Sequence, residues 1–137
     1  MILLDTNVIS EFARPAPAPA VERWYLANAG ECWLAAVALG EMAYGVAKLP
    51  PGAGRTRLEL QLADWRIAYA ARVHGFHAST AMIYGELMAN ARRAGRPMST
   101  TDAQIAATAS EHGLALATRN VTDFATTGLT LIDPWAH

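Results

Sequence analysis

Four acidic residues stand where an apolar stretch ends or where a helix is expected to begin. Asp5 follows the apolar run "MILL", and Glu41 lies in "VALGEMAYG". Asp102 lies in "STTDAQIAATA", and Asp123 follows the apolar stretch "LALAT" within "TRNVTDF". Parallel strands of an open α/β sheet end at the same edge, and ligands bind there. If the strands are parallel, we expect most of these carboxylates to meet at one edge of the sheet.

Each acid taken singly also has a purely structural interpretation. Asp5 can cap the helix that follows it. Ser99 and Asp102 have the spacing of a capping box, and the first turn of a helix favours an anion in any case. Glu41 can be an ordinary exposed helical residue, and Asp123 can cap a short turn. These interpretations are favoured for each acid alone, whereas a functional site is favoured for the set.

Clustered carboxylates predict a bound cation, because they repel one another and raise each other's pKa values until a cation neutralises them. A set of oxygen ligands favours Mg²⁺ or Mn²⁺ over zinc. The histidines show no metal-ligand spacing, and we expect them to be surface or hydrogen-bonded residues: His74, His77, His112 and His137. Magnesium held by carboxylates typically promotes attack on a phosphoryl centre. The pattern therefore predicts a nuclease or a phosphatase and leaves both open.

The hydrophobic pattern predicts strands that alternate with helices. Short apolar runs predict strands at 1–4, 32–37, 114–118 and 129–132. Helices are expected at about 6–15, 21–29, 39–48, 80–94 and 99–113. A further long helix follows "PPGAG" and carries core or interface residues at spacings of four and three: Leu58, Leu62, Trp65, Tyr69 and Val73. This order predicts an α/β sandwich of three layers, with a small, mostly parallel sheet of 4–5 strands flanked by helices.

Length and composition predict a single globular domain over residues 1–137. Hydrophobic residues make up 53% of the chain and charged residues 17%, which excludes a disordered protein. Cys32 is expected to be a small buried strand residue. No apolar run is long enough to cross a bilayer, and no leader-like segment stands at the N-terminus. We therefore expect a cytoplasmic protein without a membrane partner.

The charge balance indicates that any binding to nucleic acid must be local. The formal net charge is −1, so the chain has no broad positive field. One candidate patch consists of Arg92, Arg93 and Arg96 in "ARRAGRP". Cations also favour the C-terminus of a helix, which Gly95 would end. This helix-end interpretation is favoured, and contact with phosphate stays an alternative.

Several of these stretches together resemble the PIN-domain ribonucleases. "MILLDTNVISE", "VALGEMAYG", "STTDAQIAATA" and "LATRNVTDF" follow the order found in VapC-type toxins of bacterial toxin–antitoxin pairs. The opening and the closing "DPWAH" are most similar to the FitB branch. The resemblance spans essentially the whole chain. It implies a PIN-like fold and a Mg²⁺- or Mn²⁺-dependent endoribonuclease that cleaves RNA and arrests growth.

The resemblance also implies roles for particular residues. Asp5 and Asp102 would ligate the metal, and Glu41 would ligate it or orient the attacking water. Thr6 or Asn7 would hydrogen-bond around Asp5, and Thr101 would do so around Asp102. The fourth acid is open, because relatives can place it where this chain has Asn120, whereas Asp123 comes three residues later. Asparagine can coordinate through oxygen but carries no negative charge.

The resemblance further implies partners. A homodimer is expected, together with a cognate antitoxin of the VapB or FitA kind that lies across the acidic groove and places an arginine among the carboxylates. DNA would then be reached only through the antitoxin.

Two other classes of protein fit the sequence less well. A haloacid-dehalogenase-type phosphatase should have an aspartate where this chain has Asn7. A signalling receiver domain needs a lysine late in the chain, whereas the only lysine is Lys48. A PIN-like module that binds RNA or protein without cutting it is the alternative function. The retained acids argue against that alternative.

Overall fold

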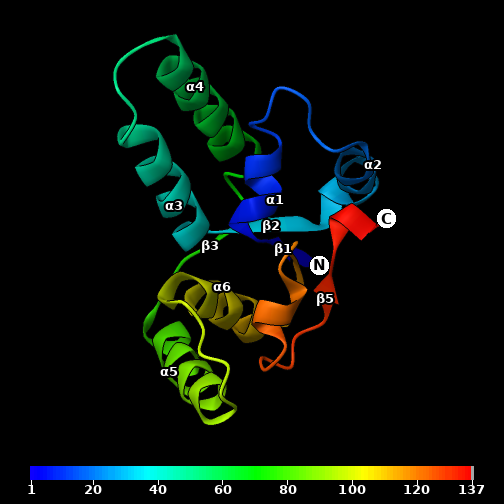
Figure 1. Ribbon diagram of the computed structural model, residues 1–137, viewed down its shortest axis with the longest axis vertical. Helices are drawn as coiled ribbons and strands as arrows, with labels where there is room; N and C mark the ends of the chain where they lie inside the picture. Colours follow the sequence, from blue (N-terminus) through cyan, green and yellow to red (C-terminus); the bar gives the residue numbers. More distant parts are fainter. Residues whose placement is uncertain (137) are drawn as a thin grey trace.

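The computed structural model describes residues 1–136 as a parallel sheet between two layers of helices (Figure 1). The strands are β1 (Ile2–Leu4), β2 (Cys32–Ala35), β3 (Val73–His74), β4 (Ala115–Ala117) and β5 (Leu131–Ile132). Their order across the five-stranded sheet is β3-β2-β1-β4-β5, and every pair is parallel. The three-layer α/β fold predicted from the sequence is confirmed.

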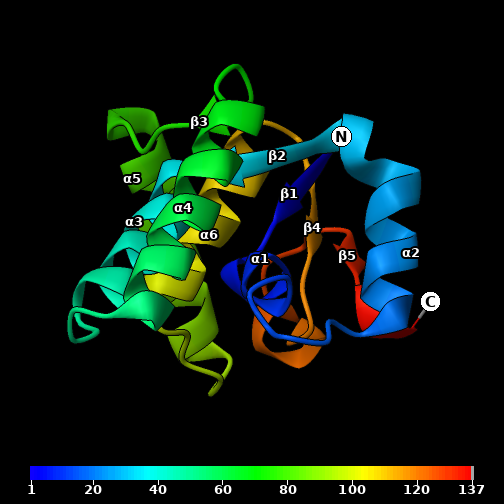
Figure 2. The ribbon, with the colours of Figure 1, turned by 90° about the horizontal axis from the view of Figure 1, so that it is seen from above.

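Four helices cover one face of the sheet and two cover the other (Figures 1 and 2). The first layer holds α1 (Thr6–Glu11), α2 (Pro19–Asn28), α3 (Ala36–Ala47) and α4 (Ala53–Ala68). The second layer holds α5 (Ala78–Arg93) and α6 (Thr100–Glu111), which pack closely on each other. Short 3-10 turns complete the described chain: η1 (Ala29–Glu31), η2 (Val121–Phe124) and η3 (Pro134–Ala136).

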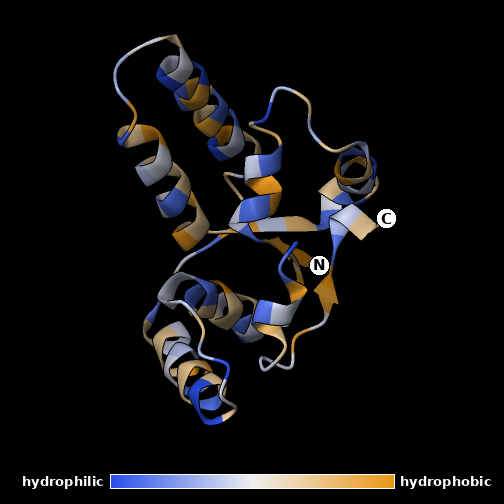
Figure 3. Ribbon diagram, in the orientation of Figure 1, coloured by the Kyte–Doolittle hydropathy of each residue, from blue (hydrophilic) through white to orange (hydrophobic). Residues whose placement is uncertain are grey.

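The central strand β1 explains why the opening run is uniformly apolar. Helices lie on both of its faces, and Ile2, Leu3 and Leu4 are all buried, as expected for a central strand of a parallel sheet. The hydrophobic colours of β1 and β5 in Figure 3 mark this core. Cys32 in β2 is fully buried, as the sequence predicted. No helix within residues 1–136 is long and apolar enough to cross a membrane.

The prediction that Val73 belongs to the long helix is wrong. Helix α4 ends at Ala68, and Val73 pairs with Leu34 in the edge strand β3. The side chain of Arg72 donates hydrogen bonds of 2.8 Å to the carbonyls of Ala29 and Cys32, which draws this segment to the sheet. Apolar spacing alone could not reveal the change, because Val73 packs against the core from β3, and an apolar residue facing the core is equally typical of a helix.

The boundary between β2 and α3 also differs from the prediction. The strand was expected to run to residue 37 and the helix to begin near residue 39, but α3 begins at Ala36. Alanine and valine are compatible with both structures, so the stretch "AAVA" contains no residue that marks the start of the helix.

Candidate active site

Asp5 directly follows the carboxyl end of β1. Its carboxylate is buried, and both of its oxygens accept hydrogen bonds. Its side chain is 4% exposed. Oδ1 accepts the backbone N–H of Thr6 at 2.7 Å, so Asp5 also caps α1. Oδ2 accepts the hydroxyl of Thr118 at 2.7 Å and the side-chain amide of Asn7 at 3.2 Å. The capping interpretation and the site interpretation of Asp5 are therefore compatible.

The environment of Asp5 favours its protonated form. The pKa of Asp5 is raised to about 6, chiefly by burial and to a smaller extent by the carboxylates of Asp102 and Glu41, against hydrogen bonds from Thr118 and Thr6 that lower it. Within residues 1–136, the charged groups that affect this pKa are the carboxylates of Asp102 and Glu41. A cation that binds Asp5 would stabilise its ionised form and lower its pKa again.

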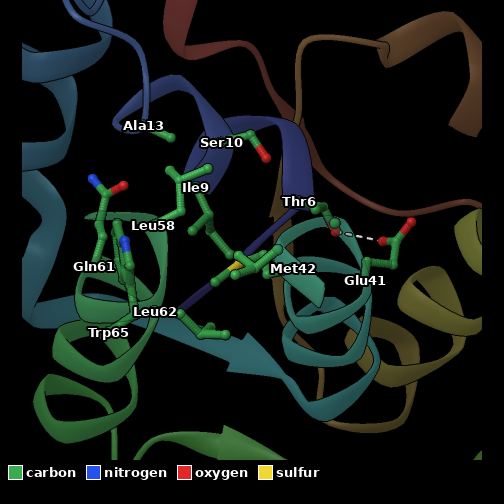
Figure 4. Close-up of a pocket in the computed structure, with 12 residues that line it drawn as sticks. Thr6, Ile9, Ser10, Ala13, Glu41, Met42, Leu58, Gln61, Leu62 and Trp65 are labelled. Carbon is green, nitrogen blue, oxygen red and sulfur yellow. Dashed lines mark hydrogen bonds between the residues drawn. The ribbon is translucent and has the colours of Figure 1, made fainter. Parts of the chain in front are cut away.

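Glu41 faces the same point from α3. Its Oε1 accepts the hydroxyl of Thr6 at 2.6 Å, which joins the start of α1 to α3 (Figure 4). Glu41 is exposed, so its carboxylate can turn toward water. It also contributes to the raised pKa values of both Asp5 and Asp102. The site thus pairs an exposed carboxylate, Glu41, with a buried one, Asp5.

Asp102 lies in the first turn of α6, on the other layer of helices. Its backbone N–H donates to the Ser99 hydroxyl at 3.1 Å, and Ser99 is the N-cap of this helix. Burial raises the pKa of Asp102, and the carboxylates of Asp123 and Glu41 raise it further. The carboxylates of Asp5, Glu41, Asp102 and Asp123 thus share one electrostatic environment at the carboxyl edge of the sheet.

The Ser99 cap should hold Asp102 in place. We expect Ser99→Ala to lower the free energy of unfolding by about 1 kcal/mol, because the N-terminal amides of α6 lose an acceptor. Ser110→Ala is a matched control, since Ser110 is exposed near the end of the same helix. Urea unfolding of both variants measures the difference. Equal stabilities of the two variants would contradict the role of Ser99 as a cap.

Thr118 is the residue at this edge that the sequence analysis missed. It is fully buried at the end of β4, and its hydroxyl donates to Asp5 while it accepts the Asn7 amide at 3.3 Å and the backbone N–H of Asn120 at 3.0 Å. The signal was present in the pairing of β1 with β4, because Leu4 lies beside Ala117 and the next residues are Asp5 and Thr118. A hydroxyl that ends a strand beside an aspartate is a candidate partner for it.

The remaining predicted residues lie around this core of the site. Asp123 is exposed in η2. Asn120 immediately precedes η2, and its backbone N–H donates to the Thr118 hydroxyl. Within residues 1–136, no hydrogen bond joins the side chain of Thr101 to Asp102; Ser99 contacts Asp102 instead. The role expected for Thr101 stays a prediction.

Comparison with known proteins shows the family. The PIN domain family matches residues 2–128. The chain belongs to the PIN-domain family. The VapC ribonuclease Y4jK of Sinorhizobium fredii is 39% identical over 98% of each chain. Toxin FitB of Neisseria gonorrhoeae is 36% identical, over 98% of this chain and 99% of FitB. A chain in the solved structure of FitAB bound to the IR36 DNA fragment superposes with a TM-score of 0.91 at 34% identity, covering 98% of this chain and 96% of that one.

The donor set of this PIN domain fits a small hard cation that keeps most of its water. As arranged, no three of the His, Cys, Asp and Glu side chains in the described part of the chain surround one point closely enough to hold an ion by themselves. Mg²⁺ is usually bound by one or two carboxylates, with waters and substrate phosphates as the other ligands. Asp5 and Asp102, whose pKa values burial and neighbouring carboxylates raise, can supply those two carboxylates.

An apolar pocket of about 250 Å³ opens beside the acids of the PIN domain (Figure 4). Thr6 and Glu41 lie at one end of it, and residues of α4, including Leu58, Leu62 and Trp65, line the other end. Ile9 and Met42 lie between them. The pocket therefore connects a hydrophobic groove between α1, α3 and α4 directly to a carboxylate of the candidate site.

The structure brings together two histidines that are distant in the sequence. The rings of His74 and His112 stack at 3.6 Å between centroids, and Trp33 stacks on His74 at 4.4 Å. Burial and the neighbouring His112 lower the pKa of His74. His112 also contacts Glu111 at 3.2 Å, but no contact within residues 1–136 joins these two histidines to the acids of the candidate site. His137 lies outside the described residues.

The arginine patch divides into two parts. Arg92 and Arg93 occupy the last turn of α5, in agreement with the helix-end interpretation. Arg96 follows Gly95, whose φ of 70° ends the helix, and its side chain donates to the carbonyl of Thr122 at 3.1 Å. Arg96 therefore contacts η2, the turn that carries Asp123.

Proposed function

We propose that this PIN-domain protein is the toxin of a toxin–antitoxin pair and a metal-dependent endoribonuclease. The observation that carries the proposal is the group of carboxylates at one sheet edge: Asp5 directly follows β1 and is bonded to Thr6 and Thr118, Glu41 is bonded to the same Thr6, and Asp102 opens α6 close enough for the carboxylate of Glu41 to raise its pKa. Burial and neighbouring carboxylates both disfavour the ionised acids unless a cation binds them. A site that binds a divalent cation and a phosphate explains this arrangement.

In this proposal Asp5 and Asp102 hold Mg²⁺ or Mn²⁺, which when bound activates water and stabilises the leaving oxygen at a phosphoryl centre. Glu41 helps to hold the ion or orients the attacking water, because it is exposed and its carboxylate accepts a hydrogen bond from the Thr6 hydroxyl. Thr6, Asn7 and Thr118 fix the carboxylate of Asp5. Asp123 is the proposed fourth acid, and Asn120 and Thr101 are supporting residues.

We also propose a VapB- or FitA-like antitoxin as the partner and a homodimer as the assembly. The FitAB relative was solved as a complex bound to DNA. In this chain, the pocket between α1, α3 and α4 can take apolar side chains of an antitoxin while its acidic end takes a cation. DNA would then be bound by the antitoxin and not by this chain, whose net charge is −1.

The proposed activity is tested by incubating antitoxin-free protein with total RNA. We expect discrete products with Mg²⁺ or Mn²⁺, none with EDTA, and none with Asp102→Asn, which removes one negative charge while keeping the side chain's shape. Glu22→Gln is the matched control, since Glu22 is an exposed acid on α2. RNA left intact by a protein that still binds metal would contradict the proposed substrate. The same cleavage pattern in EDTA would contradict the metal-dependent mechanism.

A further inference from the structure

Arg119 is an exposed cation fixed beside the acids. It lies between Thr118 and Asn120, immediately after the end of β4, and its side chain is exposed. Its backbone N–H donates to the side-chain oxygen of Asn7 at 3.4 Å. Asn7 and Thr118 both contact Asp5. The backbone of Arg119 is therefore held by Asn7, which also hydrogen-bonds to Asp5.

Within residues 1–136, the guanidinium of Arg119 forms no ion pair with those acids and lies over Trp135 instead. Ion pairs within residues 1–136 join Arg14 to Glu11, Arg55 to Glu59 and His112 to Glu111, and none involves Arg119. Among residues 1–136, Arg119 is not one of the groups that shift the pKa of Asp5 or of Asp102. The arginine thus leaves the carboxylates free to bind a metal, although it starts next to them.

Trp135 holds the guanidinium in its place. The guanidinium carbon lies over the indole ring, 5.2 Å from its centroid. The ring is itself anchored, because the backbone N–H of Trp135 donates to Asp133 at 2.9 Å and η3 packs on α2. An arginine stacked on an aromatic ring keeps its planar array of N–H donors free for a phosphate, and less side-chain freedom is lost on binding.

We propose that Arg119, presented by Trp135, binds a backbone phosphate of the RNA next to the one that is cleaved. The proposal rests on the ribonuclease function proposed above, and it makes Arg119 a substrate-positioning residue. The chain has no broad positive field, so a negatively charged strand needs fixed local cations to approach a group of carboxylates. A phosphate bound at Arg119 would bring the neighbouring phosphate toward the metal.

The experiment measures steady-state cleavage of a single-stranded RNA oligonucleotide that contains a site cut by the wild-type protein, at several salt concentrations. We expect Arg119→Ala to raise KM about 10-fold with little change in kcat, and to make the slope of log(kcat/KM) against log salt shallower by about 0.7. Arg119→Lys keeps the charge, so it should keep the wild-type slope while KM rises less. Arg66→Ala removes an exposed arginine from the last turn of α4 and should change neither KM nor the salt slope.

Several outcomes separate this inference from the proposed function. Wild-type KM and salt slope in Arg119→Ala, with active wild-type protein, would overturn the role of Arg119 alone. A lower melting temperature with an unchanged slope would show that Arg119 only fastens η3, and would also overturn it. Unchanged RNA kinetics with loss of binding to the co-purified antitoxin would assign Arg119 to the protein partner instead. A wild-type protein that cleaves no RNA would overturn the proposed function itself.

Discussion

We expect Asp5→Asn to lower the rate of RNA cleavage at least about 100-fold and to stabilise the metal-free protein at pH 7. The ionised carboxylate is unfavourable in the fold, because its pKa is raised from 3.8 to about 6. About two pKa units correspond to about 3 kcal/mol. Asparagine loses part of the bonding to Thr118, which offsets some of the gain. We expect a net increase of about 1–2 kcal/mol in the free energy of unfolding. Asparagine is a better test than alanine, since alanine would also remove the cap of α1.

The stability difference between Asp5→Asn and the wild-type protein should depend on pH. Because the pKa of Asp5 is higher in the folded protein than in the unfolded chain, the wild-type protein regains stability as pH falls from 7 through 6 toward 4. The advantage of Asp5→Asn should therefore shrink over that range and vanish near pH 4. Urea unfolding of both proteins in EDTA at pH 7, 6, 5 and 4 measures it. A constant difference between the two proteins across this range would show that the pKa of Asp5 is not raised.

Thr118→Val should destabilise the protein more than any other single change at the candidate site. Valine has nearly the same shape, but it removes the hydroxyl that donates to Asp5 and accepts from Asn7 and Asn120. Asp5 would then be buried with one fewer donor. We expect the free energy of unfolding to fall by about 2–3 kcal/mol at pH 7, and less at pH 5, where Asp5 is largely protonated.

A buried threonine elsewhere supplies the control for this change. Thr108 is also fully buried, but its hydroxyl donates only to the carbonyl of Gln104 within α6. Thr108→Val should therefore cost clearly less than Thr118→Val. Chemical denaturation of the two variants at pH 7 compares them directly. Equal losses of stability would mean that the Thr118 bond to Asp5 contributes nothing beyond ordinary packing.

Much of the architecture could be predicted because local patterns and tertiary structure agree. "MILL" followed by Asp5 marks a central strand and its polar end, and Ser99 marks the start of α6 through its side chain. Parallel pairing of β1 with β4 then places the acids at one edge. These features depend on short segments whose local sequence is compatible with few other structures.

The parts that could not be predicted depend on contacts between distant segments. Val73 became a strand residue because Arg72 bonds to carbonyls near β2, and no local pattern records that contact. Thr118 was missed because its role requires the register between two strands. His74 and His112 were expected to be scattered, yet they stack because β3 and the end of α6 meet in space.

The central claim is that these carboxylates form a divalent-metal site, and titration of the antitoxin-free protein with Mn²⁺ at pH 7.5 tests it most directly. The electron paramagnetic resonance signal of free Mn²⁺ reports how much metal is bound. We predict saturable binding by the wild-type protein that Mg²⁺ displaces, binding weakened at least about 10-fold in Asp5→Asn and in Asp102→Asn, and wild-type binding in Glu22→Gln. Equal Mn²⁺ binding by all four proteins, or none by the wild type, would contradict the account.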